Sequence, residues 1–194
     1  MIVGVLGLQG AVREHVRSLG RLNVETRIVK QCPDLEGLDG LILPGGESTT
    51  ISLLAENGIL ERLQTAARTG FPMFGTCAGM ILLAEEAEGR DHPGVGAIDI
   101  AVARNASGRQ VDSFETTLAV AGIGDDVPAV FIRAPYVTRL GDQVIPLAHH
   151  DGYVVMASQG NVLVTSFHPE LTEDLRVHRY FIEQMAHRGK ENKR

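Results

Sequence analysis

One short segment has the residue types and the setting of a cysteine nucleophile. Gly75-Thr76-Cys77-Ala78-Gly79 follows the apolar run 71–74 and opens a helical pattern. This is the strand, turn and helix order of a nucleophile elbow, with cysteine in place of serine. Unpaired N–H groups and the positive dipole end at a helix start favour a thiolate. A cysteine at a strand end is more often a small buried hydrophobe, but glycines on both sides favour Cys77 as a nucleophile.

A second segment supplies a base and a group that orients it. His168, Pro169 and Glu170 end the apolar run 161–167. Pro169 disfavours helical geometry at His168, and alternate side chains of an extended backbone point the same way. Glu170 can therefore orient the imidazole, as the third member of a catalytic triad does. A lone histidine is most often structural, but a cysteine elbow in the same chain favours His168 as the acid and base.

Other residues of these types have weaker settings. His149 and His150 are rival bases, but they precede Asp151-Gly152 in an expected hairpin, where exposed or structural roles fit better. Cys32, the second of only two cysteines, precedes Pro33 in an expected loop and has no elbow around it. The sequence therefore favours Cys77 with His168 over these alternatives.

A third segment, Pro44-Gly45-Gly46-Glu47-Ser48-Thr49, follows the apolar run 40–43. Paired glycines allow backbone N–H groups to point inward without a Cβ clash. Together with the Ala78 N–H, Gly45 and Gly46 can form an oxyanion hole. The alternative is a plain turn whose hydroxyl side chains cap the next helix, and both roles are compatible.

The elements that must position these segments alternate in type along the first half of the chain. Strands are expected at 2–8, 24–29, 40–43, 71–74 and 161–167, and helices at 11–19, 49–56, 60–68, 79–86 and 174–186. Further strands, expected to pair antiparallel, lie at 98–103, 115–120, 129–132, 144–148 and 153–157. The pattern predicts a doubly wound, mainly parallel, flavodoxin-like α/β sheet with a mixed antiparallel extension. Ligands are expected at the carboxyl ends of its parallel strands.

Length, charge and cysteine content restrict the class of protein. The 194 residues fit a single domain over 1–188, followed by a charged tail at 189–194 that we expect to be disordered. A net charge of −6 gives no basic excess for binding nucleic acid. The sequence has no membrane-spanning run, secretory signal, zinc-type cluster or Walker-type loop. We expect a cytoplasmic protein that needs neither metal nor cofactor.

Taken together and in this order, the three segments resemble the triad class of glutamine amidotransferases. More narrowly, the chain resembles the glutaminase subunits of pyridoxal 5′-phosphate synthase over essentially its whole length. The segments that carry this resemblance are Leu8-Gln9-Gly10, the 44–49 loop, Gly75 to Met80, Arg104-Asn105, Gly108-Arg109-Gln110, Ser113-Phe114-Glu115, Ile132-Arg133-Ala134-Pro135 and Ser166 to Leu171. One departure is Ser107, where the family usually has an aromatic residue.

The resemblance implies hydrolysis of glutamine to glutamate and ammonia, with the ammonia passed to a synthase subunit. It implies Cys77 as nucleophile, His168 as acid and base, and Glu170 as the orienting carboxylate. It places glutamine contacts on Gly46, Glu47, Ser48, Arg104, Ile132 and Arg133. The alternatives are a glutaminase that serves another synthase and an inactive regulatory or scaffold subunit.

Control by the partner is a further expectation. Peptides at Gly45-Gly46 can turn toward or away from an oxyanion at little steric cost. Gln9-Gly10 ends the first expected strand and should lie at the same sheet edge, where a docked partner can hold both loops. We therefore expect slow glutamine hydrolysis by the isolated chain and faster hydrolysis with the synthase.

Overall fold

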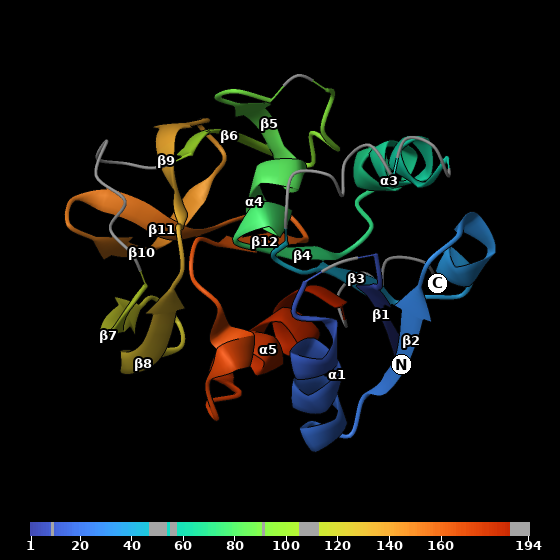
Figure 1. Ribbon diagram of the computed structural model, residues 1–194, viewed down its shortest axis with the longest axis horizontal. Coiled ribbons are helices and arrows are strands. Elements are labelled where there is room, and N and C mark those ends of the chain that lie inside the picture. Colours follow the sequence, from blue (N-terminus) through green and yellow to red (C-terminus); the bar gives the residue numbers. More distant parts are fainter. Residues whose placement is uncertain (9, 47–53, 55–57, 91, 105–112, 187–194) are drawn as a thin grey trace.

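The computed structural model describes residues 1–8, 10–46, 54, 58–90, 92–104 and 113–186 (Figure 1). Strands of the first half and the last strand are β1 (Ile2–Leu6), β2 (Glu25–Val29), β3 (Gly40–Leu43), β4 (Met73–Thr76) and β12 (Val162–Thr165). The helices are α1 (Val12–Arg21), α3 (Ile59–Arg68), α4 (Ala78–Leu83) and α5 (Arg176–Phe181), with short turns η1 (Cys32–Leu35), η2 (Pro169–Leu171) and the π-helical η3 (Ile182–Ala186). The remaining strands are β5 (Ala84–Ala87), β6 (Ile98–Arg104), β7 (Phe114–Val120), β8 (Gly124–Phe131), β9 (Pro135–Leu140), β10 (Ile145–His150) and β11 (Tyr153–Gln159).

The described strands form one large sheet and one hairpin. The order of the large sheet is β2-β1-β3-β4-β12-β11-β9-β6-β5, with β10 paired to β11, and β7 pairs with β8 in a separate sheet. From β2 to β12 all neighbours are parallel, whereas β12, β11, β9 and β6 pair antiparallel. The expected doubly wound parallel sheet with an antiparallel extension is confirmed.

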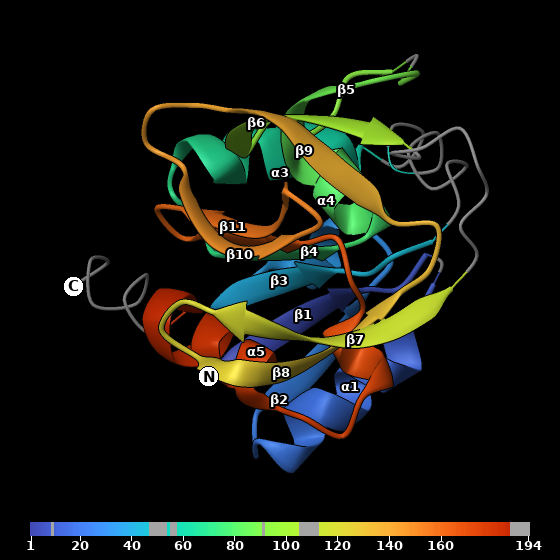
Figure 2. The ribbon, with the colours of Figure 1, turned by 90° about the vertical axis from the view of Figure 1, so that its left-hand side faces the viewer.

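Helices cover both faces of the parallel strands. Figure 2 shows α3 and α4 on one side of the sheet and α1 and α5 on the other. Strands β3, β4 and β12 are buried throughout, and their alternating side chains enter two apolar cores. Leu41 and Leu43 enter the core under α3 and α4, whereas Ile42 and Phe74 enter the core under α1 and α5. The strands are thereby fixed from both sides, and so are the loops at their carboxyl ends.

The structure shortens one predicted helix, adds strands that were not predicted, and leaves one prediction outside the described residues. The helix expected over 79–86 ends at Leu83, because Ala84 is extended and residues 84–87 pair with β6 as β5. The guanidinium of Arg90 donates to the carbonyls of Ile81 and Ala84, which caps the helix end. Strand β9 was not expected from the sequence. Of the helix expected over 49–56, only Leu54 is described, and it is helical.

Candidate active site

The three segments singled out in the sequence lie at one edge of the sheet. Strands β3, β4 and β12 are parallel neighbours, with Leu43 in register with Gly75 and Thr165 in register with Thr76. Because parallel strands end at the same edge, the loops at 44–46, 77 and 166–170 are brought side by side. The topology thus joins residues that are far apart in the sequence: Thr76 donates a hydrogen bond to Glu170, 94 positions further along the chain.

Cys77 occupies a strained turn between β4 and α4. Its φ is 51° and its ψ is −107°, a conformation that non-glycine residues rarely adopt. The Cys77 N–H donates to the Thr165 carbonyl at 2.8 Å, which ties the turn to β12. Gly79 allows the turn to be tight, since a Cβ there would collide with the Leu43 carbonyl. This is the geometry of the elbow predicted from the sequence.

His168 and Glu170 form a close buried pair. His168 Nδ1 lies 2.7 Å from Glu170 Oε1, and the Glu170 side chain has no exposed surface. Because the carboxylate can only accept, Nδ1 carries the proton and Nε2 faces away from the pair. The His168 N–H donates to the Val130 carbonyl at 2.8 Å, so β8 of the antiparallel extension fixes the backbone of the histidine.

The surroundings of His168 favour its protonated form. Burial lowers its pKa, but hydrogen bonds and charge from Cys77 and Glu170 outweigh that effect and raise the pKa to about 10. An imidazolium between a thiolate and a carboxylate fits these contacts. A thiolate beside an imidazolium supplies both a nucleophile and the proton that a leaving amine needs.

Gly45 lies directly against the cysteine and the histidine. A Cβ added at Gly45 would lie 2.6 Å from His168 Cε1 and 3.1 Å from Cys77 Cβ, so only glycine fits. The Gly45 N–H donates to Thr76 Oγ1 at 3.2 Å. Gly10, with a φ of 87°, packs so closely on the Gly45 carbonyl that a Cβ would overlap it. The loops after β1 and β3 therefore meet beside the site, as expected for Gly10.

The remaining sequence-predicted residues divide by position. Cys77 Sγ lies 3.8 Å from the Ile132 carbonyl, and Arg133 follows with a φ of 44°, so this segment forms a wall of the site. Gly46 is exposed next to Gly45. Arg104 ends β6, where its backbone pairs with Pro135. Gln9, Glu47 and Ser48 lie outside the described residues, as do Ser107 and the tail.

The rival residues are held by other contacts. His150 stacks on Phe114 and Phe131, with ring centroids 5.2 and 5.4 Å away, in the β7, β8 and β10 region. Cys32 begins η1 and packs against the core under α3 and α4. These contacts agree with structural roles for His150 and Cys32.

Sequence reasoning missed three polar residues behind Glu170. His15, His178 and Thr76 have 0% exposure and are linked by hydrogen bonds to one another or to Glu170. A usable signal was present only for His15, a histidine on the inward face of α1 beside Ser18 and Leu19. Thr76 lies within the elbow segment, where its residue type gives no separate signal.

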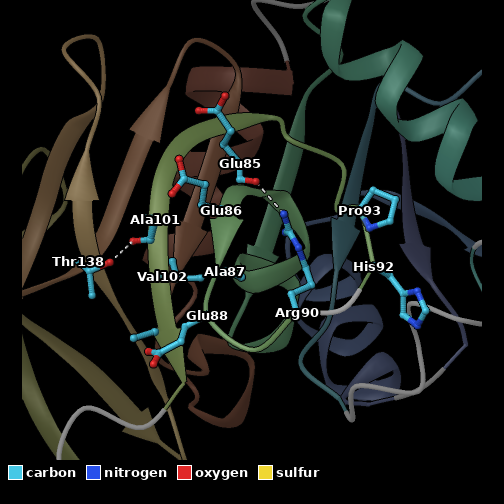
Figure 3. Close-up of a pocket in the computed structure, with 11 residues that line it drawn as sticks. Glu85, Glu86, Ala87, Glu88, Arg90, His92, Pro93, Ala101, Val102 and Thr138 are labelled. Carbon is cyan, nitrogen blue, oxygen red and sulfur yellow. Dashed lines mark hydrogen bonds between the residues drawn. The ribbon is translucent and has the colours of Figure 1, made fainter.

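A separate groove lies at the far edge of the sheet, between β5 and β6. Its volume is about 710 Å³, and none of its lining residues belongs to the cysteine, histidine and glutamate group (Figure 3). The Arg90 guanidinium there donates to the backbone carbonyls of Ile81 and Glu85. The Thr138 hydroxyl donates to the Ala101 carbonyl at 3.2 Å. Glu85 and Glu86 pair with Arg139. We assign this groove no part in the chemistry.

A cysteine elbow beside a buried histidine and glutamate at the carboxyl edge of a parallel α/β sheet is the arrangement found in cysteine-dependent hydrolases of the triad type. Comparison with known proteins narrows this class. The model of the SNO glutamine amidotransferase family matches residues 5–187. The chain belongs to the SNO glutamine amidotransferase family.

Individual relatives agree with this family. A Carboxydothermus hydrogenoformans protein named pyridoxal 5′-phosphate synthase subunit PdxT is 54% identical, covering 96% of this chain and 98% of its own. The protein of the same name from Bacillus cytotoxicus is also 54% identical, over 94% of each chain. A crystal structure described as a glutamine amidotransferase superposes with a TM-score of 0.89 at 50% identity, over 94% of this chain and 98% of the other.

More distant structures share only the fold. A chain from the structure of PurLQS from Thermotoga maritima has a TM-score of 0.68 at 18% identity, over 94% of this chain and 97% of the other.

Within the described part of the chain, no helix has the length and apolar character needed to cross a membrane. The same described residues contain no group of three or more histidine, cysteine or acidic side chains placed to hold a metal ion.

Proposed function

We propose that this chain is a glutaminase that hydrolyses L-glutamine and supplies the ammonia to a pyridoxal 5′-phosphate synthase subunit. Cys77 is the nucleophile, His168 the acid and base, and Glu170 the group that orients the imidazole. The observation that carries these roles is the 2.7 Å contact from His168 Nδ1 to Glu170 Oε1 beside the strained Cys77 turn. Family membership and the names of the close relatives support glutamine as the substrate.

The proposed reaction starts from a Cys77 thiolate and a His168 imidazolium. The Cys77 thiolate attacks the δ-carbonyl carbon of glutamine, and the His168 imidazolium gives its proton to the departing nitrogen as the C–N bond breaks. Ammonia leaves and a glutamyl thioester remains. Neutral His168 then takes a proton from water as that water attacks the thioester. Glutamate leaves, and the thiolate with its imidazolium is restored.

The oxyanion requires N–H groups that have no other acceptor. Ala78 opens α4, where the first N–H groups of a helix have no acceptor within the helix. The N–H of Gly46 is the second donor in this proposal, because the N–H of Gly45 already donates to Thr76. The loss of one such donor typically lowers the rate by about a hundredfold or more.

Glutamine itself would be held by groups around this turn. Its α-carboxylate and α-ammonium require a cation and an acceptor, which we assign to Arg104 or Arg133 and to Glu47, with Ser48 and the Ile132 backbone completing the contacts. The Ile132 carbonyl lies 3.8 Å from Cys77 Sγ, close enough to contact glutamine bound at this turn. We assign no cofactor to the chain and interpret residues 1–188 as one cytoplasmic domain followed by a charged tail.

The decisive experiment is glutamate release from glutamine by the chain alone and with saturating synthase. Wild type should release glutamate, and Cys77→Ala should reduce the rate by at least about a thousandfold, since it removes the nucleophile. Cys32→Ala is the matched control and should leave the rate unchanged. Full activity of Cys77→Ala, or inactivity of both wild type and Cys32→Ala with the synthase present, would contradict the proposal.

Control by the partner is tested in the same assay. We propose that the isolated chain is slow because a peptide at Gly45-Gly46 does not yet face the oxyanion, and that docking holds this loop together with Gln9 and Gly10. The close packing of Gly10 on the Gly45 carbonyl supports this coupling. The synthase should raise the rate of wild type more than that of Gln9→Ala. Equal activity of wild type with and without the synthase would exclude this control and leave the triad untouched.

A further inference from the structure

A chain of buried polar groups lies behind the catalytic pair. His178 Nε2 on α5 lies 3.0 Å from His15 Nδ1 on α1. His15 Nε2 in turn lies 3.3 Å from Thr76 Oγ1 and 3.5 Å from Glu170 Oε1. The His15, Thr76, Glu170 and His178 side chains are all fully buried. The hydrolysis steps described above use only one of these four residues, Glu170.

The positions of the protons in this chain follow from its contacts. Glu170 can only accept, so the His15 nitrogen beside it, Nε2, must carry a proton. Burial and the neighbouring histidines hold the pKa of His15 well below its usual range, so the ring is neutral and Nδ1 accepts. His178 must then donate from Nε2. Burial also lowers the pKa of His178 to about 4, which leaves its Nδ1 as a bare acceptor.

The same assignment satisfies Thr76. Its oxygen accepts the His15 Nε2–H at 3.3 Å and the Gly45 N–H at 3.2 Å, which uses both lone pairs. Its hydroxyl proton points to Glu170 Oε1 at 3.5 Å. Among the described residues, the His178 Nδ1 atom has no hydrogen-bond partner, as expected of a lone pair at the end of the chain. Thr76 therefore joins the triad carboxylate to the Gly45 peptide.

We propose that His15 and Thr76 are positioning residues that keep Glu170 aimed at His168 and fix the Gly45 peptide beside it, with His178 setting the tautomer of His15. This inference rests on the proposed glutaminase reaction. His15 donates to Thr76, and the Thr76 hydroxyl donates to Glu170 Oε1, the same oxygen that meets His168 Nδ1. Loss of the His15 donor should thus weaken the contact between Glu170 and His168 without removing a group that touches glutamine.

The titratable groups that face His15 define its dependence on pH. They are His178 on α5, Glu170 on η2 and His168 just before η2. Protonation of His15 at Nδ1 would oppose the Nε2–H of His178, which disfavours a charged ring. The arrangement should therefore persist throughout the pH range in which the glutaminase works.

Two variants of His15 separate hydrogen bonding from packing. His15→Gln keeps an N–H donor that can reach Thr76, whereas His15→Phe keeps the ring volume and removes both nitrogens. With saturating synthase, His15→Phe should lower kcat for glutamate release by about tenfold to a hundredfold, the equivalent of leaving one buried polar group without its hydrogen-bond partner. KM for glutamine should change by less than about threefold, since ground-state binding is untouched. His15→Gln should recover most of kcat.

A readout that does not need glutamine is the alkylation of Cys77 by iodoacetamide across pH. It should be measured in a Cys32→Ser background, so that one thiol reacts. The midpoint of the profile should move to higher pH in His15→Phe and stay near wild type in His15→Gln. Unchanged kcat and an unchanged midpoint in a folded His15→Phe protein would overturn the proposal.

The tautomers can be tested in the unmodified protein, whether or not His15→Phe folds. In ¹⁵N-histidine NMR near neutral pH, His15 and His178 should both be neutral with the proton on Nε2. The signals are assigned by the loss of one set in His178→Phe. A charged ring, or a proton on Nδ1 of His15, would overturn the proposal. If wild type does not hydrolyse glutamine, the proposed function fails. The alkylation and NMR results still test the hydrogen-bonded arrangement of His15, Thr76 and His178.

Discussion

The parallel strands and the antiparallel extension of this molecule differ in what they bury. Strands β3, β4 and β12 are buried along their whole length, and the loops after them carry Gly45, Cys77 and His168. Strand β7 of the extension alternates between exposed and buried positions, and among the described strands it pairs with β8 alone, in a two-stranded sheet. The parallel strands therefore provide the fixed edge on which the chemistry depends.

The two regions also treat charge differently. Glu170 of the proposed catalytic pair, and His15 and His178 behind it, have no exposed surface. In the extension, Arg139 pairs with Asp99 at 2.7 Å and with Glu86 at 3.2 Å, but these side chains are 41–66% exposed. A buried polar group must have a specific partner, whereas exposed pairs compete with water. The extension contributes to the site mainly through its backbone, by the Val130 carbonyl that holds His168 and the Ile132 carbonyl beside Cys77.

The comparison predicts the largest effects for the buried catalytic pair. His168→Asn should lower kcat for glutamate release by at least about a thousandfold, because it removes the acid and base. Glu170→Gln keeps the shape but not the charge and should cost less than His168→Asn. The check is steady-state glutamate release with saturating synthase. Equal activity of both variants and wild type would refute the assignment of the pair.

Substitutions of apolar side chains should lower the free energy of unfolding more in the parallel sheet than in the extension. Phe74 is fully buried on β4 against Phe181, with ring centroids 5.5 Å apart, and Phe74→Ala should lower the free energy of unfolding by about 3–5 kcal/mol. Phe114 of the hairpin is half-buried and stacks on Phe131, so Phe114→Ala should cost about 1–2 kcal/mol. Urea unfolding measures both. A larger loss for Phe114→Ala would mean that the hairpin, and not the parallel sheet, limits stability.

Acid should destabilise the folded chain through the buried histidines. The pKa of His178 is lowered from 6.5 to about 4, so between these values the unfolded chain binds a proton that the folded chain does not. Stability from this group is therefore complete above pH 6.5 and decreases as the pH falls to about 4, by roughly 3 kcal/mol. His15, whose pKa is also lowered, acts in the same direction.

The measurement must avoid an opposing contribution. The pKa of His168 is raised to about 10, so its contribution to stability grows as the pH falls from about 10 to 6.5 and is complete below 6.5. Urea unfolding of wild type and His178→Phe from about pH 6.5 to about pH 4 lies below that window, and the difference between the two proteins isolates His178. An identical pH dependence for both proteins would show that His178 does not stay neutral in the folded chain.

The smallest effect is expected for the exposed ion pairs of the extension. Arg139→Ala removes pairs to Asp99, Glu85 and Glu86, and should lower the free energy of unfolding by less than about 1 kcal/mol. The difference should shrink in about 1 M salt, where exposed charges are screened. Glutaminase activity should not change. A loss of several kcal/mol, or of activity, would mean that the extension does more than supply a wall of the site.

Local sequence signals were sufficient to predict the parallel sheet and the three loops of the site. Apolar runs of β-branched residues identify buried strands, and Gly75, Cys77 and Gly79 identify an elbow, because these signals lie within a few neighbouring residues. Pro169 similarly indicates how Glu170 can reach His168 from two positions away. The order of the loops along the chain then implies a shared sheet edge, and neighbouring β3, β4 and β12 confirm it.

The strands of the extension and the residues behind Glu170 depend on contacts between distant segments and could not be predicted from local sequence. Strand β5 forms because residues 84–87 find β6, and β9 forms between β11 and β6, which are pairings that local sequence does not encode. His15 and His178 are 163 positions apart, and each by itself is an ordinary histidine on a helix. Their tautomers, and the role we propose for them, follow from burial and from a carboxylate contributed by a third element, so no single segment of the chain contains that information.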